Sequence, residues 1–132
     1  PLMLQREKMD ALVCQELGLE TSPADMSEWE AVIQRIIKPQ HQVRIGVIGK
    51  YIHLQDAYKS VYEAVTHAGG ANDCAIEIVR VDSEDIERDG AAAYLAEMDG
   101  ILVPGGFGER GVEGKVLAAQ YARENNVPYL GL

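Results

Sequence analysis

The pattern of apolar and polar positions divides the chain into two parts. In residues 1–40, apolar side chains recur at helical spacing, and a polar connector separates two short segments. From residue 43 onward, short apolar runs typical of strands alternate along the chain with longer amphipathic runs typical of helices. The pattern predicts strands at 43–48, 75–81, 99–104 and 127–132, and helices at 54–68, 82–98 and 111–125.

The first part is expected to form two short helices. Gly18 suits the position just after the first helix. Ser27 and Glu30 form a capping-box pattern that predicts the start of the second helix, and Pro39 ends it. Because a helix this short is marginal alone, its apolar face needs a partner. The apolar stripes are Met9, Leu12, Val13 and Leu17 in the first helix and Trp29, Val32, Ile33 and Ile36 in the second.

The second part predicts an α/β fold with a doubly wound, flavodoxin-like parallel sheet. Strands and helices alternate with short connections, so right-handed crossovers are expected. The order of the strands within the sheet stays open. Gly69 and Gly70 are expected to end the helix that begins at residue 54. The expected core residues on the strands are Ile45, Val47, Ile101 and Val103.

Composition and charge restrict the classes of function. The 132 residues are 47% hydrophobic and carry a formal charge of −9, so binding to a nucleic-acid backbone is disfavoured, although a local site for one nucleotide remains open. A membrane-spanning run and a signal-peptide pattern are both absent, which favours the cytoplasm. Cys14 and Cys74 are expected to be free thiols, and the three histidines show no metal-ligand spacing. The first residue, Pro1, is not an initiator methionine, which indicates a fragment.

A glycine-rich loop follows the third predicted strand, in the stretch "ILVPGGFGERGVEGK" from residue 101 to 115. In an open α/β sheet, ligands bind outside the carboxyl ends of the strands, and this loop lies at that edge. Its N–H groups suit an anion nest or half of an oxyanion hole. Arg110 could pair with a phosphate or carboxylate, and Phe107 could stack on a ring.

The alternative is that the glycine-rich stretch is a strand-to-helix turn that binds no ligand. The loop is not a Walker A sequence, and its G-x-G-x-x-G match follows the wrong strand for a Rossmann site.

The last strand, "VPYLGL", leads into a second candidate feature. Nucleophile elbows have the pattern G-x-Ser-x-G, or the same with cysteine, at a strand-to-helix turn. Gly131 and Leu132 would supply its first two positions. The nucleophile would be the next residue.

Three segments together resemble the CTP synthase family of glutamine-dependent amidoligases. They are "IGVIGKYIHLQDAYKSVYEAV", "LVPGGFGERGVEGK" and "ARENNVPYLGL". The resemblance implies that residues 1–40 are the end of a synthetase domain and a helical linker. Residues 41–132 would be the N-terminal half of a class I glutaminase domain.

The resemblance also implies roles for individual residues. Gly106 and its neighbour Gly105 would lie at the glutamine site, with a backbone N–H facing the oxyanion. Phe107 and Arg110 would contact the activator GTP. The route by which ammonia passes between the domains would be lined by Lys50 and Tyr51.

Several parts of such an enzyme would lie outside this chain. The nucleophilic cysteine is expected just after Leu132, so no catalytic residue and no metal site is assigned here, and the chain alone is expected to be inactive. The fragment is expected to bind no cofactor. The parent enzyme would use ATP and Mg²⁺, would be activated by GTP, and would form a homotetramer through its synthetase domain.

Two alternatives belong to other classes. One is a non-catalytic flavodoxin-like module that binds a nucleotide or a partner through the glycine loop. The other is a different glutaminase subunit, which the segment "GKYIHLQDAYKSV" disfavours. In the half of a glutaminase domain that the resemblance implies, the last strand is expected to be left uncovered on at least one side.

Overall fold

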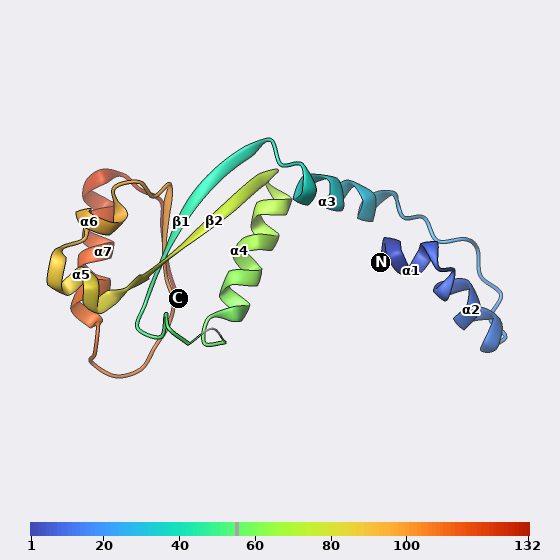
Figure 1. The fold of residues 1–132 in the computed structure, drawn as a ribbon, viewed down its shortest axis with the longest axis horizontal. Helices are drawn as coiled ribbons and strands as arrows, with labels where there is room; N and C mark the ends of the chain where they lie inside the picture. Colours follow the sequence, from blue (N-terminus) through green and yellow to red (C-terminus); the bar gives the residue numbers. More distant parts are fainter. Residues whose placement is uncertain (55) are drawn as a thin grey trace.

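The computed structural model describes residues 1–54 and 56–132 and contains a parallel sheet in that part of the chain (Figure 1). Its strands lie in the order β2-β1-β3-β4, so β1 and β3 are central and β2 and β4 are edges. All three pairings are parallel. This confirms the predicted doubly wound topology and settles the order that the sequence left open. The strands are β1 (His41–Gly49), β2 (Cys74–Asp82), β3 (Gly100–Val103) and β4 (Tyr129–Gly131).

Helices lie on both faces of the sheet, as Figure 1 shows. One face carries α4 (Lys59–Ala71), and the other carries α5 (Ser83–Asp89), α6 (Ala92–Leu95) and α7 (Val112–Asn125). The main core lies between the strands and the α5–α7 layer, because apolar strand residues there meet small alanines of α7. The buried cluster consists of Ile48, Val81, Ile86, Leu95, Met98, Ile101, Val103, Ala118 and Ala122.

The predicted end of the helix at Gly69 and Gly70 was wrong, because α4 continues to Ala71. Gly69 and Gly70 do not end α4 but lie inside it, buried. A Cβ on Gly69 would lie 2.5 Å from Ile76 Cγ1 on β2, and one on Gly70 would lie 2.9 Å from Ile36 Cγ1. These glycines therefore permit close packing of α4 rather than its termination. Gln55, within the predicted range 54–68, lies outside the described residues, and α4 itself begins at Lys59.

The predicted helix 82–98 is two helices. Gly90 has a φ of +86° and separates α5 from α6, because an L-residue helix does not continue through that conformation. Asp82 caps the start of α5, because its carboxylate accepts a hydrogen bond from the Glu84 N–H at 2.9 Å.

The N-terminal helices are α1 (Leu2–Arg6), α2 (Met9–Glu16) and α3 (Ser27–Ile37). The capping box was wrong: Ser27 is the first helical residue, and its N–H donates to Asp25 Oδ1 at 3.0 Å. Figure 1 shows α1 and α2 away from the sheet, and the apolar stripe of α2 is exposed. By contrast, α3 packs on α4, so only the second stripe meets a partner within the described residues.

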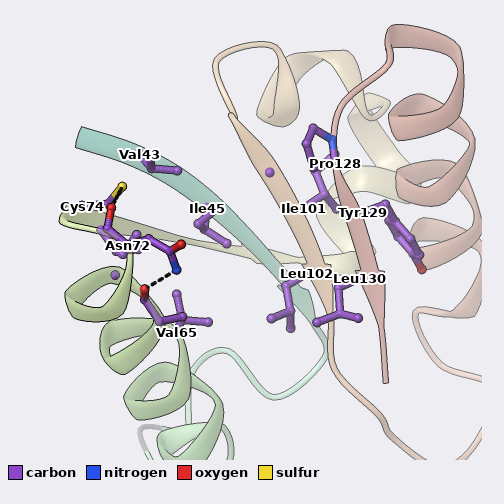
Figure 2. A pocket seen from close by; sticks show the side chains of 14 residues that line it. Val43, Ile45, Val65, Asn72, Cys74, Ile101, Leu102, Pro128, Tyr129 and Leu130 are labelled. Carbon is purple, nitrogen blue, oxygen red and sulfur yellow. Dashed lines mark hydrogen bonds between the residues drawn. The ribbon is translucent and has the colours of Figure 1, made fainter. Parts of the chain in front are cut away.

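An apolar groove of about 390 Å³ lies beside α4 on the less covered face of the sheet. Figure 2 shows Val65 of α4 and residues Ile45, Leu102 and Leu130 of three neighbouring strands around it. All three residues of β4 are exposed, as expected for the last strand. No helix in the described part of the chain is both long and apolar enough to cross a membrane.

Candidate functional site

The glycine loop occupies residues 104–111, between the end of β3 and the start of α7. Because β1, β3 and β4 are parallel, their carboxyl ends meet at the edge of the sheet where this loop begins. Val103, the last residue of β3, pairs with Gly131 of β4. The loop therefore lies where the strand pattern placed it.

Two lysine side chains donate hydrogen bonds to backbone carbonyls of the loop. Lys50 directly follows β1 and is only 4% exposed. Its Nζ donates to the carbonyl oxygens of Phe107 and Gly108, the latter at 3.0 Å. Lys115 on α7 donates to the Pro104 carbonyl at 3.0 Å. Burial, together with repulsion from the nearby Lys50 ammonium, lowers the pKa of Lys115 below its ordinary value.

Arg110 links the loop to the start of α5 and to the end of β1. One guanidinium nitrogen donates to Glu84 Oε2 at 2.8 Å, and another donates to the Lys50 carbonyl at 2.8 Å. Its Cζ lies 5.8 Å from the centre of the Tyr51 ring. Lys50 thus receives a hydrogen bond from the loop through its backbone and gives two back through its side chain. Three cations, Lys50, Arg110 and Lys115, gather at this loop although the whole chain is acidic.

Unusually close packing anchors the far end of the loop. Gly111 has a φ of +70°, and a Cβ there would lie 2.2 Å from Ser83 Oγ. A Cβ on Gly114, in the first turn of α7, would lie 1.8 Å from the Ser83 carbonyl oxygen. The start of α7 therefore rests directly on the backbone at the start of α5. The Ser83 side chain is fully buried there, and its Oγ has no hydrogen-bond partner among the described residues.

The remaining predicted residues occupy different parts of the loop. Gly106 lies between the lysines: a Cβ there would be 3.1 Å from Lys50 Cε and 3.5 Å from Lys115 Nζ. Gly105 lies beside the end of β4, since its Cβ would be 3.6 Å from the Leu132 carbonyl oxygen. Phe107 is 95% exposed and projects from the loop.

The structure brings all six predicted site residues to one edge of the sheet and adds residues that sequence reasoning missed. Ser83 follows β2 directly, and that position was a usable signal, because the carboxyl ends of parallel strands share one edge. Lys115 and Glu84 carried no signal beyond their charge. The apolar groove contains no residue of the loop and is a separate feature.

Comparisons with known proteins show which family the chain resembles. The sequence profile of the family "Glutamine amidotransferase class-I" matches residues 53–132. A CTP synthase from Carboxydothermus hydrogenoformans is 52% identical over the whole chain, and one from Bacillus cytotoxicus is 49% identical. The chain spans 25% of the length of each.

A solved structure extends the agreement to the fold. The glutaminase domain of the Trypanosoma brucei CTP synthase, with bound acivicin, matches with a TM-score of 0.62 and 47% identity. The match covers 67% of this chain and 35% of that one. The resemblance predicted from the sequence and the class I glutaminase fold are thereby confirmed, and the chain belongs to the class-I glutamine amidotransferase family.

Proposed function

We propose that this chain is part of a glutamine-dependent CTP synthase, an enzyme that aminates UTP to CTP with ATP and with ammonia from glutamine. In this proposal, residues 1–40 are the end of the synthetase domain and the linker, and residues 41–132 begin the glutaminase domain. Relatives called CTP synthase, 47–52% identical over the whole chain, support it.

One structural observation carries the assignment of the glutamine site. Gly105 lies beside Leu132, which directly follows the strand that leads into the elbow pattern, and Gly106 is the next residue of the loop. A cysteine directly after Leu132 would thus have loop N–H groups close to its sulfur. The thiolate would attack the glutamine carboxamide carbon, and the developing oxyanion would accept a hydrogen bond from the Gly106 N–H. Collapse of this intermediate would release ammonia and leave a thioester, which water hydrolyses to glutamate.

The other roles follow from the same placement. Phe107, exposed on the loop, would stack on the base of GTP, and Arg110 would contact the same activator. Lys50 and Tyr51 would line the passage of ammonia toward the synthetase domain. ATP and Mg²⁺ are assigned to that domain, as the resemblance to CTP synthase implies. The parent would assemble as a homotetramer through its synthetase domain.

The test uses a protein extended through the complete glutaminase domain and measures ammonia release from glutamine with and without GTP. Gly106→Pro removes the N–H donor and is expected to reduce kcat by about 10²- to 10³-fold. Gly106→Ala keeps the donor, and the nearest neighbours of its Cβ are the flexible ends of Lys50 and Lys115, at 3.1 and 3.5 Å, so it is expected to retain far more activity. Equal activity of the two variants would contradict the oxyanion role.

A second function is favoured by the exposed Phe107 beside three cations, an arrangement that also suits a non-catalytic nucleotide-binding module. If the extended, folded protein binds GTP but releases no ammonia from glutamine, that second function replaces the first.

A further inference from the structure

Lys50 is a buried cation that joins the end of β1 to the tip of the glycine loop. The side chain is 4% exposed, and its Nζ donates to two successive loop carbonyls, those of Phe107 and Gly108. Residues 105–110 are all exposed, and among the described residues the Phe107 and Gly108 carbonyls accept hydrogen bonds only from Lys50. Lys50 is therefore the main polar contact that fixes the tip of the loop.

These two hydrogen bonds determine the orientation of two peptide planes. The described chain contains no cis peptide bond, so the carbonyl of each loop residue points opposite to the next N–H. With the Phe107 and Gly108 carbonyls turned toward Lys50, the N–H groups of Gly108 and Glu109 point away from it. In the described part of the chain, neither N–H donates to a protein acceptor. Lys50 thus keeps carbonyl dipoles on the inner side of the loop and donors on the outer side.

Lys50 also lies against Gly106, the proposed oxyanion donor. A Cβ on Gly106 would be 3.1 Å from Lys50 Cε, so the lysine stem supports that residue directly. Arg110 strengthens the arrangement, since it donates to the Lys50 carbonyl and is held by Glu84. The Gly106 N–H belongs to the Gly105–Gly106 peptide. A rotation of the 107–108 peptide would break the Lys50 contact and, through the adjoining Gly106–Phe107 peptide, change the backbone angles at Gly106 on which the direction of that N–H depends.

We propose that Lys50 is a positioning residue for glutamine hydrolysis, which holds the glycine loop in the orientation that presents the Gly106 N–H to the oxyanion. The inference rests on the proposed glutaminase function. It differs from a role in ammonia passage, which would affect the transfer of ammonia but not its release from glutamine.

The experiment compares Lys50→Met, Lys50→Arg and Lys50→Gln in a full-length protein that carries this sequence, with Lys38→Met as the control for loss of an exposed lysine. Glutamine hydrolysis and CTP formation from added ammonium are measured separately. Lys50→Met is expected to lower the kcat for glutamine hydrolysis by about tenfold or more, with KM changed by less than about threefold, since the lost interaction acts on the transition state. The loss of glutamine hydrolysis in Lys50→Met should exceed any loss of CTP formation from added ammonium. Lys50→Arg should recover most of the lost kcat, because its guanidinium donates to carbonyls.

The ¹⁵N–¹H signals of Gly108 and Glu109 give a second readout, which should shift in Lys50→Met and return toward wild type in Lys50→Arg. An unchanged kcat in Lys50→Met, or loss of coupled CTP formation with normal glutamine hydrolysis, would overturn the proposal. If Lys50→Met does not fold, an equal kcat in Lys50→Gln and Lys50→Arg would overturn it, because the shorter amide cannot make both bonds. Absence of glutamine hydrolysis in the wild-type protein would instead refute the proposed function.

Discussion

Replacing Gly114 by alanine tests the packing that anchors the glycine loop. The new Cβ would lie 1.8 Å from the Ser83 carbonyl oxygen and 2.7 Å from the Ser83 carbonyl carbon, so the clash is with backbone. Because a carbon rarely approaches a carbonyl oxygen closer than about 3.3 Å, α7 would have to move by about 1.5 Å. Such overpacking typically costs about 1–3 kcal/mol, and more where backbone must shift. The gain in helix propensity is at most about 1 kcal/mol. We expect a net loss of about 2 kcal/mol or more in the free energy of unfolding.

Chemical denaturation of the extended glutaminase protein measures this loss, and Ser83→Ala makes the test selective. A Cβ on Gly111 would meet Ser83 Oγ at 2.2 Å, whereas the Gly114 clash involves the Ser83 main chain. Ser83→Ala should therefore relieve part of the cost of Gly111→Ala, by a coupling of about 1 kcal/mol, but none of the cost of Gly114→Ala. A neutral or stabilising Gly114→Ala, or equal relief of both variants, would refute this reasoning.

Two further predictions concern the charges around the loop. Arg110→Ala should change the free energy of unfolding by less than about 1 kcal/mol, because its ion pair with Glu84 is half-exposed, yet it should remove GTP activation. Chemical denaturation measures the change in stability, and a GTP titration of glutamine hydrolysis measures the activation. Full GTP activation of Arg110→Ala would contradict the assignment of Arg110 to the GTP site. The pKa of Lys115 should rise toward its ordinary value in Lys50→Met, because one of the two causes that lower it is removed. NMR titration of the Lys115 side chain measures this change, and an unaltered pKa would show that burial alone sets it.

The location of the site could be predicted from the sequence because it depends on topology. Alternating strand and helix patterns require a parallel sheet, and in such a sheet the loop after β3 and the end of β4 share one edge. The proximity of Gly105 to Leu132 follows from this rule. The exposure of Phe107 was likewise consistent with its place in a glycine-rich loop.

The glycines inside helices could not be interpreted from local pattern alone. Gly69 and Gly70 match a helix end in sequence, but their role is set by side chains of β2 and α3 that are distant along the chain. The same holds for Gly114, whose need for a bare Cα comes from Ser83. Local rules describe the cost of glycine in a helix, whereas tertiary packing decides whether a Cβ fits.

The polar contacts of the loop were also beyond sequence reasoning. Lys50 could be recognised as part of a motif, but its side chain had no predicted partner. Its burial and its bonds to two loop carbonyls depend on how β1 and the loop meet in space. The Ser27 capping box failed for a related reason, because Asp25, two residues earlier, accepts the N–H hydrogen bond instead.

The glycine loop is proposed to be half of an oxyanion hole whose nucleophile follows Leu132. The most direct measurement is ammonia release from glutamine, with GTP present, by this chain and by the protein extended through the complete glutaminase domain. The extended protein should be active, Gly106→Pro should lower its kcat by about 10²- to 10³-fold without unfolding it, and the 132-residue chain should be silent. An extended protein that folds and binds GTP but releases no ammonia, or a Gly106→Pro variant with normal turnover, would contradict the proposal.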